Sequence, residues 1–178
     1  MKKTIFYLIG VFISTSIFSQ LSVLKLVGKN SKEHKLGYGA FYSIDYSVGG
    51  MANRKIVFEV EFGTFAAKST SVLESAAFGS FKLGYRHIFS EESRTGFFVE
   101  PQVGYCMTGI GEYNEELAKG VALAFITGYS LGVGKQDNCF LFGLKWESDL
   151  ANNNKQLNTI GFRVAFIYSL FGNKKNNE

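Results

Sequence analysis

The segment Leu36-Gly-Tyr-Gly-Ala-Phe-Tyr-Ser-Ile-Asp-Tyr-Ser-Val48 decides the fold, because its residues alternate strictly between two kinds. Leu36, Tyr38, Ile44 and Tyr46 share one side of the alternation, and the other side is mostly glycine, serine and aspartate. Successive side chains of a β-strand point to opposite faces, so a period of two residues predicts a strand.

Six further segments alternate in the same way, and in all seven the apolar face carries no Asp, Glu, Lys or Arg. They span residues 55–65, 76–89, 96–107, 120–134, 139–148 and 158–171. A first strand at about 21–28 alternates poorly, and we include it because membrane barrels of this kind have an even number of strands. The sequence therefore predicts an all-β fold, an antiparallel up-and-down transmembrane β-barrel of eight strands.

The predicted strands and connections also fit a membrane barrel. Most of the strands are longer than the five or six residues usual in soluble proteins, and a spanning strand needs about nine to eleven. The connections 49–54, 90–95 and 135–138 are short, whereas 66–75, 108–119 and 149–157 are longer and polar. Short periplasmic turns and longer outer loops are typical of outer-membrane barrels.

Alternation alone does not say which face points inward. A soluble lipocalin-like periplasmic barrel, with its apolar side chains around an apolar ligand, is the alternative. The aromatic face is too bulky for the interior of a small barrel, while the other face is rich in Gly, Ala and Ser. We therefore predict that the aromatic face meets lipid.

Charged residues on the second face then point into the lumen. Because unpaired charges are costly when desolvated, we predict a paired network in which Glu59 and Glu61 meet Lys82 and Arg86. A gate or proton path is the functional alternative to a packed plug that closes the lumen. The predicted lumen network comprises Asp45, Glu59, Glu61, Lys82, Arg86, Glu100, Lys145, Glu147 and Arg163.

Aromatic residues with a polar atom recur near the predicted strand ends, which suggests two girdles at the headgroup level of a bilayer. One girdle lies near the ends of the inward-running strands and the other at the opposite ends. The predicted interface residues are Tyr46, Tyr85, Tyr129 and Tyr168 in the first, and Tyr38, Tyr105 and Trp146 in the second.

The N-terminus predicts export. Lys2 and Lys3 precede an apolar run from Ile5 to Ile13 and a segment of small residues, the pattern of a signal peptide. An uncleaved anchor helix is the alternative, but the run is short for a membrane span. We expect a signal peptide at 1–19, an outer-membrane barrel at 20–172 and a polar tail at 173–178.

Composition bounds the remaining possibilities. The net charge is +4 before export, and no basic cluster with interleaved aromatics predicts nucleic-acid binding. Cys106 and Cys139 are expected near opposite ends of the barrel, beyond bridging distance, as two free buried thiols.

Signals for chemistry are weak, and we predict no catalytic residue, metal site or cofactor. A lipid-modifying barrel enzyme would need a histidine, a nucleophile and a carboxylate near the outer rim. His34 lies near the first predicted loop, and His87 lies on the apolar face near the periplasmic end. A cluster of glutamates in the loop 108–119 could bind a divalent cation between lipopolysaccharide phosphates, although such runs are usually solvated: Glu112, Glu115 and Glu116.

Two stretches carry a resemblance to a known group. Phe81-Lys-Leu-Gly-Tyr-Arg-His-Ile-Phe89 and Gly96-Phe-Phe-Val-Glu-Pro-Gln-Val-Gly-Tyr105 resemble the small outer-membrane β-barrel proteins of the Bacteroidetes, the porin-family or PorT-like group. The resemblance implies an eight-stranded barrel similar to OmpA or OmpX in architecture, and it brings no shared active site.

The sequence thus predicts a small integral outer-membrane protein with a filled lumen and a structural, adhesive or assembly-related role. Its expected partners are outer-membrane lipid, lipopolysaccharide and the outer-membrane assembly machinery. A lipid-modifying outer-membrane enzyme and the soluble barrel remain the alternatives.

Overall fold

The computed structural model describes residues 20–27, 34–48, 53–67, 75–90, 95–111, 117–133, 138–152 and 157–167. The predicted signal peptide, the glutamate cluster at 112–116, Tyr168 and the polar tail lie outside these residues. No helix in the described part of the chain has the length and apolarity needed to cross a bilayer.

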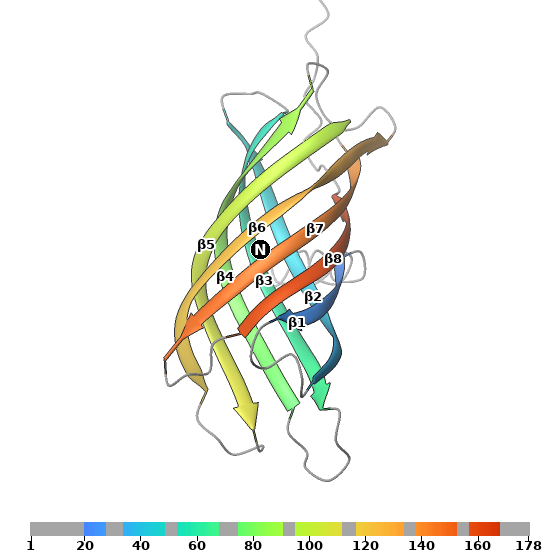
Figure 1. Ribbon diagram of the computed structural model, residues 1–178. Helices are drawn as coiled ribbons and strands as arrows, with labels where there is room; N and C mark the ends of the chain where they lie inside the picture. The colour runs from blue at the N-terminus through green and yellow to red at the C-terminus, as the bar shows by residue number, and fades with distance from the viewer. Residues whose placement is uncertain are drawn as a thin grey trace, which may run out of the picture.

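The described residues form a closed barrel of eight antiparallel strands in sequence order, as predicted (Figure 1). The strands are β1 (Gln20–Val27), β2 (His34–Ser47), β3 (Arg54–Ala67), β4 (Ser75–Phe89), β5 (Gly96–Gly111), β6 (Ala118–Val133), β7 (Asn138–Ala151) and β8 (Leu157–Ile167). We call the end where the odd-numbered strands begin the proximal end, and the other the distal end.

The short first strand closes the barrel. β1 pairs with β2 from Leu21↔Ala40 to Leu24↔Gly37, and with β8 along its whole length. Its sequence alternates poorly because Leu24 and Leu26 are apolar residues that point into the lumen, where both are buried. The prediction of a first strand, made from the even strand number of membrane barrels, was therefore correct.

The predicted alternation of loop lengths was wrong. The strands run further toward the distal end than predicted, with β5 reaching Gly111, β6 starting at Ala118 and β7 reaching Ala151. The β5–β6 ladder continues through Met107↔Lys119 and Thr108↔Ala118, and the β6–β7 ladder reaches Gly120↔Ala151. Backbone pairing persists there although the residues no longer alternate between apolar and polar types.

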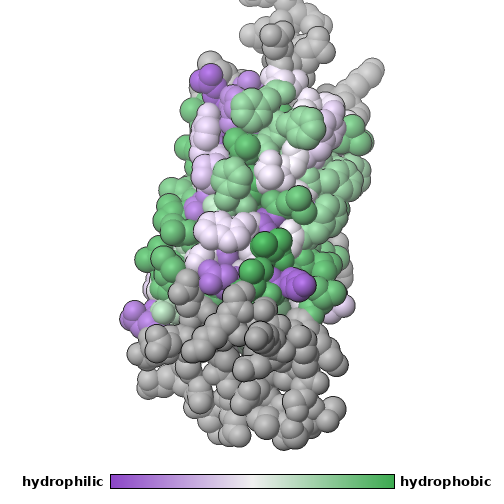
Figure 2. Space-filling view, viewed as in Figure 1, coloured by the Kyte–Doolittle hydropathy of each residue, from purple (hydrophilic) through white to green (hydrophobic). Residues whose placement is uncertain are grey.

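The aromatic face points outward, as predicted. Phe97, Phe62 and Phe89 are 68%, 62% and 59% exposed, and green apolar side chains cover much of the described wall in Figure 2. The six carboxylates of the described strands face the lumen, where five of these residues are buried and the side chain of Asp45 is 5% exposed. This arrangement is the reverse of a lipocalin-like barrel, whose apolar side chains face inward.

Apolar side chains occupy both ends of the lumen. The proximal cluster packs residues of six strands around one another: Phe41, Ile88, Phe98, Ile126, Cys139, Leu141 and Ala165. The distal cluster contains Leu24, Leu26, Phe65, Ala76, Phe78 and Leu157. The charged residues lie mainly between these clusters, so the middle of the lumen is polar and both ends are partly sealed.

Inward-facing glycines let neighbouring strands approach closely. At Gly128 of β6 an added Cβ would overlap the carbonyl oxygen of Phe142 on β7, and at Gly104 of β5 it would overlap that of Phe81 on β4. Strand glycines commonly mark such close approaches of two backbones.

We expect Gly128→Ala to lower the free energy of unfolding by about 1–3 kcal/mol, because the new methyl group meets backbone that cannot move away. Urea titration of the folded barrel in detergent micelles measures the change. Gly79→Ala is the matched control, since its Cβ would meet mainly the Phe62 ring, with the nearest atom 3.1 Å away. Equal losses in the two variants would contradict the backbone explanation.

Candidate functional site: the ion-pair network of the lumen

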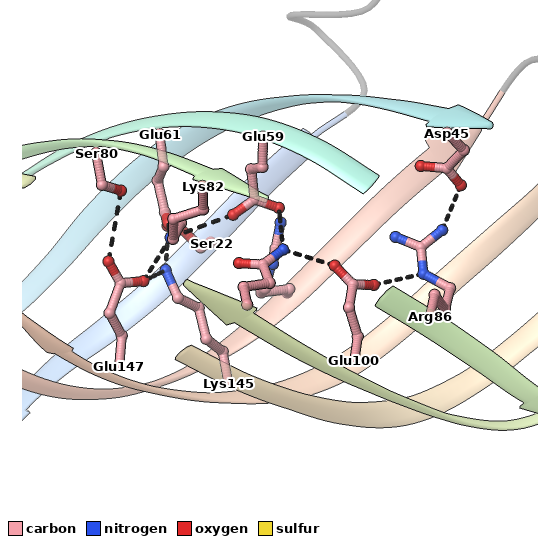
Figure 3. Close-up of polar contacts among 12 residues, drawn as sticks. Ser22, Asp45, Glu59, Glu61, Ser80, Lys82, Arg86, Glu100, Lys145 and Glu147 are labelled. Carbon is pink, nitrogen blue, oxygen red and sulfur yellow. Dashed lines mark hydrogen bonds and ion pairs between the residues drawn. The ribbon is translucent and has the colours of Figure 1, made fainter. Parts of the chain in front are cut away.

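Lys82 is the centre of the charge network. Its Nζ lies 2.6 Å from Glu147 Oε2, 2.7 Å from Glu61 Oε2 and 3.2 Å from Glu59 Oε1 (Figure 3). Lys145 Nζ also donates to Glu61 and Glu147. The two lysines come from β4 and β7, so these ion pairs join opposite walls of the barrel.

The network continues from Glu59 toward the proximal end. Arg163 of β8 donates through Nη2 to Glu59 Oε2, at 2.5 Å. The amide of Gln102 donates to Glu59 Oε2 at 3.2 Å and to Glu100 Oε1 at 2.6 Å. Gln102 therefore connects two carboxylates that would otherwise repel each other.

Arg86 completes the network at its proximal end. Its Nε donates to Glu100, and its Nη1 donates to Asp45. Lys55 Nζ lies 3.8 Å from Asp45 Oδ2. The structure thus brings all nine residues of the predicted network into the lumen, where each makes an ion pair. Figure 3 labels all of them except Arg163.

One predicted pairing differs. Arg86 was expected to meet Glu59 and Glu61, but it pairs instead with Asp45 and Glu100. Arg86 lies four residues beyond Lys82 on β4, hence two inward positions closer to the proximal end. Because His87 pairs with Val99 in the β4–β5 register, Arg86 and Glu100 reach the same level of the lumen.

Four polar residues and one further carboxylate of the lumen were not identified from the sequence. Ser22 donates to Glu61 at 3.2 Å, and Ser80 donates to Glu147 at 3.4 Å. Gln102 and Lys55 lie on the inward face of segments already predicted as strands, so the alternation could have found both. Asp149 was assigned to a loop because β7 was predicted to end at residue 148.

Asp149 gives the described lumen one more carboxylate than cations. Six acidic residues face five basic ones, the basic ones being Lys55, Lys82, Arg86, Lys145 and Arg163. Asp149 is buried and lies beside Glu147, two residues earlier on the same face, and near the Cys106 thiol. Cys106 and Cys139 are both free and buried, as predicted.

Aromatic rings pack against both arginines of the network. Arg163 Cζ lies 3.5 Å from the centre of the Phe41 ring, and Arg86 Cζ lies 5.6 Å from that of Phe98. These rings belong to the proximal apolar cluster, and a cavity of about 10 Å³ remains between them and the arginines. That volume is at the lower limit for a single water molecule.

The six predicted interface aromatics within the described residues all lie on the outer wall. They are Tyr38, Tyr46, Tyr85, Tyr105, Tyr129 and Trp146, at 40–70% exposed. Tyr105 and Trp146 are not at strand ends, because β5 extends to Gly111 and β7 to Ala151. Their position at a membrane interface remains a prediction.

His87 lies apart from the lumen network. His87 is half-buried on the outer wall, 4.7 Å from the Phe89 ring, and its cross-strand neighbours are Arg54 and Val99. In the described part of the chain no three His, Cys, Asp or Glu side chains are arranged to hold a metal ion. The backbone of His34 begins β2.

The fold is that of small outer-membrane barrels. The chain is similar to the crystal structure of Neisserial surface protein A, NspA, with a TM-score of 0.64 at 11% identity over 83% of this chain and 92% of that one. Lower scores relate it to the outer membrane enzyme PagL (0.49, 13% identity, 85% and 100% covered) and to Ail, the attachment invasion locus protein of Yersinia pestis (0.47, 12%, 83% and 91%). No protein-family profile and no curated protein matches the sequence. NspA therefore supports the eight-stranded architecture, while the Bacteroidetes resemblance remains a prediction.

We expect Lys82→Met to lower the free energy of unfolding by about 3–5 kcal/mol, because it leaves buried carboxylates without their shared cation. Urea titration in micelles measures the loss. Lys119→Met is the matched control, since Lys119 is exposed on the outer wall. A similar small effect of both changes would show that the lumen is hydrated enough to tolerate unpaired carboxylates.

Glu100 tests the other half of the network. Glu100→Ala should lower stability by a few kcal/mol, because Arg86 and Gln102 lose a buried acceptor. Glu100→Gln keeps one side-chain oxygen as acceptor and should lose less. No change in the unfolding midpoint of the alanine variant would mean that Glu100 faces water.

Proposed function

We propose that this protein is a small integral outer-membrane β-barrel protein with a filled lumen and a structural, adhesive or assembly-related role. The main support for the proposal is the distribution of side chains between the outer wall and the lumen. Large apolar residues cover the outer wall, while the described carboxylates face the lumen, where Asp45, Glu59, Glu61, Glu100 and Glu147 make ion pairs. A contiguous apolar surface of this extent would be unfavourable in water, and an outward apolar band with a polar interior is typical of barrels in outer membranes.

The proposal includes export by a cleaved signal peptide at 1–19 and membership of the PorT-like group of the Bacteroidetes. The basic and apolar N-terminal segment supports the first, and the resemblance of residues 81–89 and 96–105 supports the second. The likeness to NspA supports the architecture that both require.

The proposed partners are outer-membrane lipid, lipopolysaccharide and the outer-membrane assembly machinery, and we propose no enzymatic activity. The outer wall provides the surface for lipid. In the described lumen the charges are used to join the strands to one another, and the two apolar clusters occupy its ends. The protein would then act through its wall and its rims, and it would not conduct ions through an open pore.

Membrane fractionation combined with heat-shift electrophoresis tests this proposal. The protein should sediment with outer membranes, resist extraction without detergent, and migrate differently before and after boiling. In planar bilayers the purified protein should give no steady conductance, because eight strands leave room only for side chains.

Two results would contradict the proposal in different ways. Release by osmotic shock without detergent, together with the absence of a heat shift, would indicate a soluble periplasmic protein. A stable conductance from a membrane-inserted, heat-shifting protein would keep the location but refute the filled lumen.

A further inference from the structure

The charged side chains on the outer wall of the described strands are all basic. The acidic side chains of these strands face the lumen, whereas Lys25, Arg54 and Lys119 are exposed on the outside. Lys25 and Lys119 lie near the distal end, in β1 and at the start of β6. Arg54 is the first residue of β3, at the proximal end. An outer wall with only positive charges at its edges is complementary to anionic headgroups.

At the proximal rim Arg54 has a second nitrogen-bearing side chain beside it. Arg54 pairs with His87 in the β3–β4 register, so both side chains leave the wall at the same level. The adjacent turn is tied to β4: Ile88 N–H donates to the Asn53 carbonyl at 2.8 Å, and Asn53 Nδ2 donates to the Ser90 carbonyl at 3.4 Å. These bonds fix the backbone next to Arg54 and His87.

From this pair toward the distal end, the outer wall of β3 and β4 is apolar. Successive outward cross-strand pairs are Ile56↔Tyr85, Phe58↔Leu83, Val60↔Phe81 and Phe62↔Gly79. From Arg54 to Phe62 the strand rises about 26 Å at about 3.3 Å per residue, or about 20 Å along the barrel axis at a tilt of about 40°. One leaflet contributes about 15 Å of hydrocarbon, so the stripe is long enough for an acyl chain.

We propose that Arg54 and His87 bind the phosphate of an anionic phospholipid, whose acyl chains lie along the β3–β4 stripe. The inference rests on the proposed membrane location and adds a specific lipid site to it. Arginine supplies a guanidinium that matches phosphate oxygens in charge and geometry, and the imidazole supplies a further hydrogen-bond donor. The leaflet concerned is the one at the proximal end.

Native mass spectrometry of the folded protein in detergent micelles provides the test. The probes are phosphatidylglycerol and phosphatidylcholine with identical acyl chains, titrated separately. Wild-type protein should retain phosphatidylglycerol several-fold more tightly than phosphatidylcholine. Arg54→Gln should reduce the retention of phosphatidylglycerol about three- to tenfold, and His87→Gln should reduce it less.

Lys119→Gln is the matched control, because it removes the same charge from the opposite end of the outer wall. It should reduce the retention of phosphatidylglycerol much less than Arg54→Gln does. Equal losses in Arg54→Gln and Lys119→Gln would show that only net charge matters, and would overturn the site. Unchanged retention in both Arg54→Gln and His87→Gln would also overturn it, as would equally tight binding of inorganic phosphate alone.

The heat shift separates this inference from the proposed function. A protein that sediments with outer membranes and shifts on boiling, but does not prefer phosphatidylglycerol, refutes the lipid site alone. A protein that does neither refutes the membrane location, and the lipid site with it.

Discussion

The structure depends on the pairing of desolvated charges inside a narrow barrel. Glu59 and Glu61 are fully buried, and neither could remain ionised there without a cation in contact. Lys82 serves both and also Glu147, so a single ammonium group fixes the distance between β3 and β7 across the lumen. The ladder hydrogen bonds close the wall, but it is this network that determines how the lumen is filled.

Small inward residues make the network possible. An eight-stranded barrel has an interior just wide enough for packed side chains, so long charged residues must alternate with positions that occupy almost no volume. Gly104 and Gly128 supply such positions where the neighbouring backbone approaches too closely for a Cβ. The arginines then extend over the rings of Phe41 and Phe98, which joins the polar middle of the lumen to its apolar proximal end.

Alternation in the sequence was sufficient to predict seven of the eight strands, their faces and nine members of the lumen network, because each depends on local periodicity. It could not predict which charges meet, since that depends on relative strand levels around the closed barrel. Arg86 was accordingly given the wrong partners. Asp149 was missed for another reason: the backbone ladder continues beyond the last alternating residue, and loop-like sequence at a strand end does not reveal this. β1 had to be inferred from strand parity, because Leu24 and Leu26 make its inward face apolar.

A lumen whose charged groups pair with one another restricts where the protein can interact with other molecules. The ion pairs that stabilise the barrel engage the lumen's charged groups with one another, and the apolar clusters lie toward both ends. Opening a path would separate buried charges from their partners at a cost of several kcal/mol per ion. The described outer wall is the surface that can contact other molecules without separating these ion pairs. On the described wall the charged residues are few and basic and lie near strand ends, so an anionic partner would be favoured there.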